Sequence, residues 1–276
     1  MDFYGTMLLK KANNEDISLL GANSLALKKC LENTLTTITE DMLDGASEIR
    51  AYAFYKCSHL EGVEIPSSIV NIGNYSFYDC TGLENVTIQQ GVTNIGESVF
   101  RQCSSLKSIT IPEGVTTIQV GTFYDCTSLK SVTLPNGLET IMNETFVHCD
   151  LSGEELVIPD GVTRIGYSAF FGSKVKNATI GYGVTDIENS VFNSCAYLEN
   201  VTIPSSVTNI TSWSFNACSS LKSLTVLATN PPTLNNNVFN GAPNNFLIYV
   251  PAGSVDAYKS ASRWSSYGNR IQAIPS

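Results

Sequence analysis

Charge is scarce in this chain, and clustered basic residues and long apolar runs are missing. Charged residues make up 15% of the 276 residues, and the net charge is −9. Without a Lys/Arg cluster, the chain lacks the electrostatic footprint of proteins that bind nucleic acids or anionic membranes. No apolar run reaches the roughly 18 residues of a membrane-spanning helix, so we expect no insertion into a membrane. The stretch Met7-Leu8-Leu9, followed by Lys10 and Lys11, does not read as a secretory signal peptide.

Histidine is also scarce, which bears on catalysis. His59 and His148 are the only two histidines, and they occupy different positions of distant repeats. A Ser/His/Asp or Cys/His arrangement therefore has no way to assemble. There is no glycine-rich phosphate loop. Asp79 and Asp125 share one repeat position, but no insertion would build a pocket around such a pair. We predict that the protein is not an enzyme and that it holds no cofactor.

A repeat of about 23 residues is what the sequence has in abundance. Phe100, Cys103 and Leu106 recur as Phe123, Cys126 and Leu129. Such a period is typical of a solenoid, in which each coil buries its apolar side only by stacking on its neighbours. The phenylalanine of this motif recurs nine times, as Phe54, Phe77, Phe100, Phe123, Phe146, Phe170, Phe192, Phe215 and Phe239.

Between these phenylalanines, short segments alternate apolar and polar residues, as in Val86-Thr87-Ile88 and Ile109-Thr110-Ile111. Period-2 alternation predicts strands whose outer residues face the core and whose middle residue faces solvent. Stacked coils would place these strands in one parallel sheet. A proline that lacks the N–H donor usually ends the segment. The Phe-x-x-Cys piece is too short for a helix, so we expect one helical or 3₁₀ turn there.

The cysteines follow the repeat rather than a disulfide framework. Equivalent positions in stacked coils lie about 4.8 Å apart with parallel side-chain directions, whereas a disulfide needs side chains that converge. Metal ligands in such a row would form a line rather than a tetrahedron. The sequence therefore predicts a ladder of buried thiols with no metal. Its members are Cys57, Cys80, Cys103, Cys126, Cys149, Cys195 and Cys218.

The pattern L-x-x-V-x-I-P-x-x-V-x-x-I-G-x-x-A-F-x-x-C-x-x-L resembles the BspA-like class of leucine-rich repeat proteins over about residues 45–242. The tail with Ile248-Tyr249-Val250 and Trp264 looks like that family's closing segment. The expected fold is an α/β solenoid: a right-handed leucine-rich-repeat superhelix with a parallel β-sheet on one face and short strands and helical turns elsewhere. We expect an N-terminal cap at 1–45, the array at 46–242 and a C-terminal cap at 243–276. Irregular spacing predicts a local bulge around Asp150–Glu154.

Three rows of exposed residues are candidates for binding. A polar row on the strand face either contacts a partner or consists simply of good strand formers. A row of tyrosines (Tyr55, Tyr78, Tyr124) either stacks on sugars or proteins, or packs between coils. Charges where the strands begin, such as Glu84/Lys107 and Glu199/Lys222, are expected to serve register and solubility. The polar row comprises Asn85, Thr87, Thr110, Thr133, Asn177, Thr179, Asn200 and Thr202.

The resemblance implies a function as well as a fold. Members of this family are largely bacterial surface or secreted proteins, so we expect an extracellular or cell-surface adhesion protein. Its partner would be a protein or a glycan on another cell surface, bound by a monomer. An alternative is a structural or recognition component of a phage or prophage particle.

Overall fold

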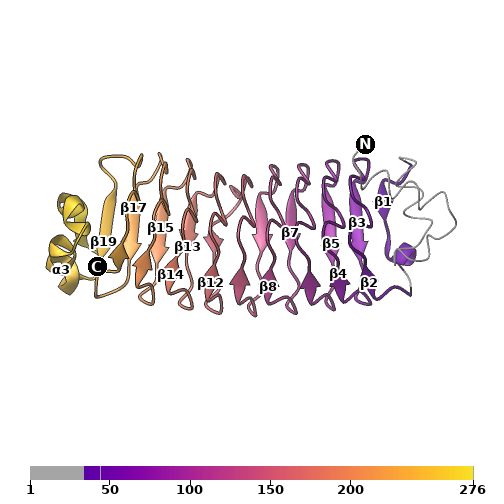
Figure 1. Cartoon of the computed structure of the whole chain (residues 1–276), viewed down its shortest axis with the longest axis horizontal. Coiled ribbons are helices and arrows are strands. Elements are labelled where there is room, and N and C mark those ends of the chain that lie inside the picture. Colours follow the sequence, from indigo (N-terminus) through magenta and orange to yellow (C-terminus); the bar gives the residue numbers. More distant parts are fainter. Residues whose placement is uncertain (1–33, 44, 276) are drawn as a thin grey trace. The chain divides into compact units, whose positions relative to one another are not determined.

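A computed structural model describes residues 34–43 and 45–275, and the chain divides into two compact units, Met1–Pro135 (unit 1) and Asn136–Ser276 (unit 2). Figure 1 shows how strands of successive coils lie side by side within each unit. Most of the N-terminal cap predicted for 1–45 lies outside the described residues.

Unit 1 contains two parallel sheets. One has the strand order β1-β3-β5-β7-β9 and the other β2-β4-β6. Gly62–Ile65 of β3 pairs in register with Asn85–Ile88 of β5, one coil later. The bounds are β1 Thr37–Ile38, η2 Glu40–Leu43, β2 Glu48–Ile49, β3 Gly62–Ile65, β4 Asn71–Ile72, β5 Asn85–Ile88, β6 Asn94–Ile95, β7 Ser108–Thr110, β8 Thr117–Ile118 and β9 Ser131–Thr133.

Unit 2 repeats this plan. Its larger parallel sheet has the order β11-β13-β15-β17-β19-β20, while β14-β16-β18 form a smaller sheet and β10 pairs with β12. The bounds are β10 Thr140–Ile141, β11 Leu156–Val157, β12 Arg164–Ile165, β13 Asn177–Thr179, β14 Asp186–Ile187, β15 Asn200–Ile203, β16 Asn209–Ile210, β17 Ser223–Val226, β18 Thr233–Leu234, β19 Leu247–Val250, η3 Ala252–Ser254, α3 Val255–Ser260, η4 Trp264–Arg270 and β20 Ile271–Ala273. Each unit is a parallel-strand solenoid, which confirms the predicted fold class.

The recurring phenylalanines form the centre of the core. In unit 1, Phe77 stacks between Phe54 and Phe100 with ring centroids 5.2 and 5.6 Å apart. In unit 2, Phe192 stacks between Phe170 and Phe215 at 5.2 and 5.5 Å. The interplanar angles do not exceed 13° in these pairs, and the side chains are fully buried. Offset stacking adds to the apolar area that each ring buries.

The turn around each phenylalanine corrects one prediction, because it is neither helical nor 3₁₀. The residues two before and two after Phe100, Ser98 and Gln102, have φ values of 52° and 63°. The N–H groups of Ser98 and Phe100 donate to Val120 and Thr122 of the next coil at 3.0 and 2.9 Å. These N–H groups therefore bond to the neighbouring coil and not along a helix. The intercoil hydrogen bonds offset the energetic cost of the left-handed conformation in residues that have a Cβ atom.

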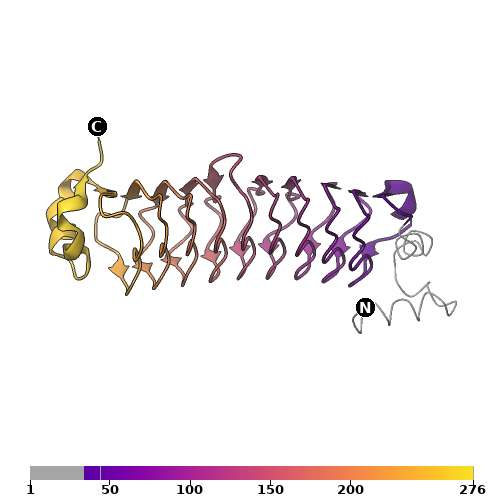
Figure 2. The same ribbon diagram turned by 90° about the horizontal axis from the view of Figure 1, so that it is seen from above.

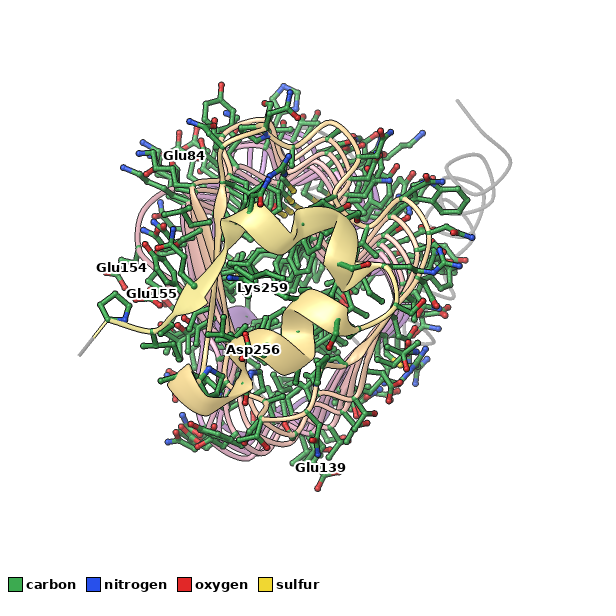
Figure 3. All side chains as sticks on the ribbon, turned by 90° about the vertical axis from the view of Figure 1, so that its left-hand side faces the viewer. Glu84, Glu139, Glu154, Glu155, Asp256 and Lys259 are labelled. Atoms are coloured by element: carbon green, nitrogen blue, oxygen red, sulfur yellow. The ribbon has the colours of Figure 1, made fainter. Side chains whose placement is uncertain are left out.

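The C-terminal end of unit 2 is closed by α3 and η4, which Figure 3 shows from outside with Asp256 and Lys259 on α3. Two buried aromatic residues attach this segment to the last coils. Tyr258 Oη donates to the Ala228 carbonyl at 2.8 Å, and Trp264 Nε1 donates to the Pro232 carbonyl at 2.7 Å. The cap thus covers apolar side chains of the last coil and satisfies carbonyls that no further coil would reach.

Replacing Tyr258 with phenylalanine should lower the free energy of unfolding by about 1–3 kcal/mol, because the Ala228 carbonyl would stay buried without its donor. Urea denaturation followed by circular dichroism measures this loss. Tyr182→Phe is the matched control, since Tyr182 is 58% exposed and its hydroxyl can bond to water. A Tyr258→Phe protein as stable as the control would show that this hydrogen bond does not hold the cap.

Candidate binding surface

The larger sheet of unit 1 presents the predicted polar row to solvent. Asn85, Thr87, Thr110 and Thr133 are all exposed, while Ile109, between Ser108 and Thr110, is buried. Thr110 pairs in register with Thr133. A hollow of about 270 Å³ lies over β3 and β5, where Gly62 has no side chain. It brings Asn85 and Thr87 together with Thr37, Glu61, Val63 and Glu64.

The larger sheet of unit 2 carries the other half of the polar row, and here the side chains bond to one another. Asn200 Nδ2 donates to Asn177 Oδ1 at 2.8 Å, and Ser223 Oγ donates to Asn200 Oδ1 at 2.7 Å. Thr179 and Thr202 pair in register and are half-buried. This part of the row is an ordered surface, because its amides are fixed by cross-strand hydrogen bonds.

The tyrosine row is split in the structure. Tyr55 stacks on Tyr78 at 5.1 Å, and Tyr52 stacks on Tyr75 at 5.1 Å, so these four rings pack between two coils. Tyr124 lies under the Arg101 guanidinium, 3.8 Å from the ring centroid. Intercoil packing, the alternative interpretation of this row, therefore describes the contacts of Tyr55 and Tyr78.

A second hollow, which the sequence did not reveal, lies at the edge of the larger sheet of unit 2 where its strands begin. Its volume is about 380 Å³. Lys174 contacts Asp150 at 3.5 Å, and Glu199 contacts both Lys176 at 3.7 Å and Lys222 at 2.6 Å. The signal in the sequence was Tyr197, which stands where the flanking coils have Lys174 and Ser220. The lining residues are Asp150, Ser152, Lys174, Lys176, Tyr197, Glu199 and Ser220.

Both carboxylates of this hollow are held ionised. The hydrogen bond from Lys222, together with the charges of Lys176 and Lys222, lowers the pKa of Glu199. Burial by itself would raise the pKa of Asp150. Hydrogen bonds from the side chain and backbone of Ser152, together with the Lys174 ammonium, outweigh this effect and lower the pKa of the carboxyl group. At neutral pH the hollow therefore presents ionised carboxylates, which accept hydrogen bonds, beside ammonium groups, which donate them.

The buried cysteines make a hydrogen bond that the sequence did not predict. Cys103 Sγ donates to the Phe77 carbonyl of the preceding coil at 3.2 Å, and Cys195 Sγ donates to Phe170 at 3.0 Å. Six described cysteines are buried thiols outside any disulfide. The predicted ladder of thiols is wrong for Cys57, which is disulfide-bonded to a partner outside the described residues. The eighth cysteine of the chain lies outside the repeat position, so the parallel register of the coils does not apply to it.

Both histidines lie on exposed turns. His59 is exposed and has Ser58 Oγ 3.4 Å from its Nδ1, and exposed His148 packs edge-on against Phe171. Within residues 34–43 and 45–275, no three His, Cys, Asp or Glu side chains gather as metal ligands. None of the helices in that part of the chain has the length and apolar character needed to cross a membrane.

The repeats that form the stacked coils match a known protein family. The family model described as "BspA type Leucine rich repeat region" matches six copies over residues 47–156 and 151–258. The chain belongs to the BspA-type leucine-rich repeat family. This confirms the family expected from the Phe-x-x-Cys-x-x-Leu repeat.

Solved structures of several bacterial leucine-rich repeat proteins are similar to this BspA-type chain. A leucine-rich cell surface protein from Faecalibacterium prausnitzii is 26% identical, with 84% of this chain and 80% of that chain covered and a TM-score of 0.48. A leucine-rich repeat protein from T. pallidum is 24% identical over 68% and 77%, with a TM-score of 0.48. The pneumococcal vaccine antigen PcpA is 17% identical over 87% and 83%, with a TM-score of 0.44. A search of curated proteins finds no match.

Proposed function

We propose that this BspA-type protein is a non-catalytic adhesion module that acts at a cell surface or outside the cell. It binds a protein or a glycan on another cell through the outward face of its larger sheets. The observation that carries the proposal is the register-aligned polar row, exposed along β5, β7 and β9 of unit 1. Regular strands hold this row rigid, so a partner meets an ordered surface at little entropic cost.

The composition of the face suits contact with another macromolecule. Asn85, Thr87, Thr110 and Thr133 are polar and uncharged, so covering them removes no ionised group from water. Their hydroxyl and amide groups both donate and accept hydrogen bonds. The inward residues are already used by the core, which leaves the outward row as the part of the strands available to a partner.

The disulfide at Cys57 supports the proposed location. Disulfides form and persist mainly in oxidising compartments such as the bacterial periplasm and the extracellular medium. The buried thiols do not weigh against such a location, because they are sheltered within the coils.

Labelled protein should bind cultured epithelial cells, and the double variant Thr110→Arg/Thr133→Arg should lower that binding at least tenfold. Two long cations on adjacent strands would block the face without entering the core, so thermal unfolding should change little. The matched control is Thr93→Arg/Thr116→Arg, which adds the same charge at exposed positions just before β6 and β8. Flow cytometry with the three proteins makes the comparison.

The control separates a blocked face from a change of net charge. Undiminished cell binding by Thr110→Arg/Thr133→Arg would remove the sheet face of unit 1 from the proposal. An equal loss in both double variants would point to charge alone and would also contradict it.

A further inference from the structure

The hollow at the N-terminal edge of the larger sheet of unit 2 has the features of a small-ligand site. Its volume of about 380 Å³ falls within the range of roughly 300–1,000 Å³ that is typical of ligand pockets. It combines an aromatic ring with ammonium, carboxylate and hydroxyl groups from four successive coils. The hollow over β3 and β5 in unit 1 has acidic and neutral lining residues but no aromatic ring and no cation.

An irregular coil builds one wall of the hollow. The loop between Cys149 and β11 carries an extra residue, and Ser152 and the residues after it are exposed. Glu155 Oε1 accepts a hydrogen bond from Thr179 Oγ1 at 2.6 Å, which ties the loop to β13. Figure 2 shows this loop standing out from the adjacent coils of unit 2, and Glu154 and Glu155 project outward in Figure 3. The flat sheet edge thereby gains a recess.

The charges in the hollow are almost balanced. Two lining ammonium groups (Lys174 and Lys176) meet two lining carboxylates (Asp150 and Glu199), and Lys222, which is not part of the lining, also contacts Glu199. Each carboxylate can accept about four hydrogen bonds and each ammonium can donate three, so the ion pairs leave capacity unused. A strongly anionic ligand would lie beside two carboxylates, and a strongly cationic one beside the ammonium groups, so like charges oppose both. A neutral ligand with many hydroxyl groups can donate to the carboxylates and accept from the ammonium groups at once.

Tyr197 adds a flat apolar surface at the same place. The residue is 59% exposed, so a ligand in the hollow can reach it. A ring in this setting offers an apolar body and a polar hydroxyl beside the charged groups. A pyranose ring has the complementary form, with C–H groups on its faces and hydroxyls around its edge.

We propose that this hollow binds a hexopyranose unit of a neutral glycan. The sugar ring lies against Tyr197, its hydroxyls donate to Asp150 and Glu199, and its oxygens accept from Lys174 and Lys176. The inference rests on the proposed function as a binding module and gives that module a ligand class at unit 2. The sheet face of unit 1 remains a separate surface.

Saturation-transfer NMR on the full chain tests the proposal with the methyl pyranosides of glucose, galactose, mannose and N-acetylglucosamine. At least one of the four should bind in the millimolar range, the affinity expected of a single shallow contact. Tyr197→Ala should weaken that binding at least tenfold, and Glu199→Gln severalfold. The matched control is Tyr182→Ala, because Tyr182 is almost equally exposed (58%) and lines a hollow at the opposite edge of the same sheet with Val157 and Pro159. This control should bind as the unaltered chain does.

The outcomes separate this inference from the adhesion proposal. Lack of binding to all four pyranosides, or equal binding by Tyr197→Ala and the unaltered chain, would overturn the sugar site. Binding of sialic acid in place of the neutral sugars would also contradict it, since an anionic ligand is then preferred. Sugar binding retained by a chain that fails to bind cells would leave this site standing and remove only the adhesion function.

Discussion

Replacing Phe192 with alanine should lower the free energy of unfolding by about 3–5 kcal/mol. Phe192 is fully buried between the rings of Phe170 and Phe215, at centroid distances of 5.2 and 5.5 Å. Each neighbouring ring is positioned by its own turn, and those turns are joined by backbone hydrogen bonds to the coils on either side. The stack can therefore collapse only partly, and a cavity remains. Urea denaturation followed by far-ultraviolet circular dichroism measures the loss.

Two further variants show whether the cavity is the cause. Phe192→Leu keeps an apolar side chain in the stack, so its cost should be clearly smaller than that of the alanine variant. Tyr182→Ala removes an aromatic side chain from the surface of the same unit and should change stability by about 0.5 kcal/mol or less. A Phe192→Ala protein that loses less than about 1 kcal/mol would mean that the aromatic stack does not hold unit 2 together.

Alkylation of the native protein by iodoacetamide at pH 8 should be at least about 1,000-fold slower at Cys195 than in urea. Burial raises the pKa of the Cys195 thiol to about 12. At pH 8 its thiolate fraction is then about one in ten thousand, compared with about one quarter for an ordinary thiol of pKa near 8.5. Mass spectrometry of the peptides after timed alkylation gives the rates. A native rate equal to that in urea would show that Cys195 lies open to solvent.

The same thiols predict a loss of stability at alkaline pH. Burial raises the pKa values of Cys80, Cys103, Cys195 and Cys218 in the folded chain. The unfolded chain releases these protons first, so the stabilisation is complete below about pH 8.5 and declines as pH rises further. For Cys195 the decline continues to about pH 12, where the buried thiol also ionises. Denaturation midpoints between pH 8 and pH 11 test this, and Cys195→Ala should show the shallower slope.

The repeated elements were predictable from the sequence because each depends on one coil and its copies. A phenylalanine at the same position of every coil, such as Phe77 or Phe170, can be buried by all copies only if the coils stack. Period-2 alternation likewise indicated that Thr110 faces solvent while Ile109 faces the core. Strand pairing between equal positions of successive coils then follows from their equal length.

The turns around the phenylalanines could not be predicted in the same way. Ser98, Gln102 and Asp125 adopt left-handed backbone although none is glycine. Local preference disfavours this conformation, and hydrogen bonds to the next coil outweigh that preference. The thiol hydrogen bonds also join residues of two coils, so neither coil shows them alone.

The sequence by itself determined the solenoid, its parallel sheets, the buried face of each coil and the outward polar row. These features follow from a pattern of apolar and polar positions that recurs in every repeat. The tertiary structure alone decided the backbone of the turns, the pairing of Tyr52 with Tyr75, and the hollow that unites Asp150, Lys174 and Tyr197. Those features arise from contacts between residues more than 20 positions apart. Their geometry depends on how a coil of irregular length settles against its neighbours.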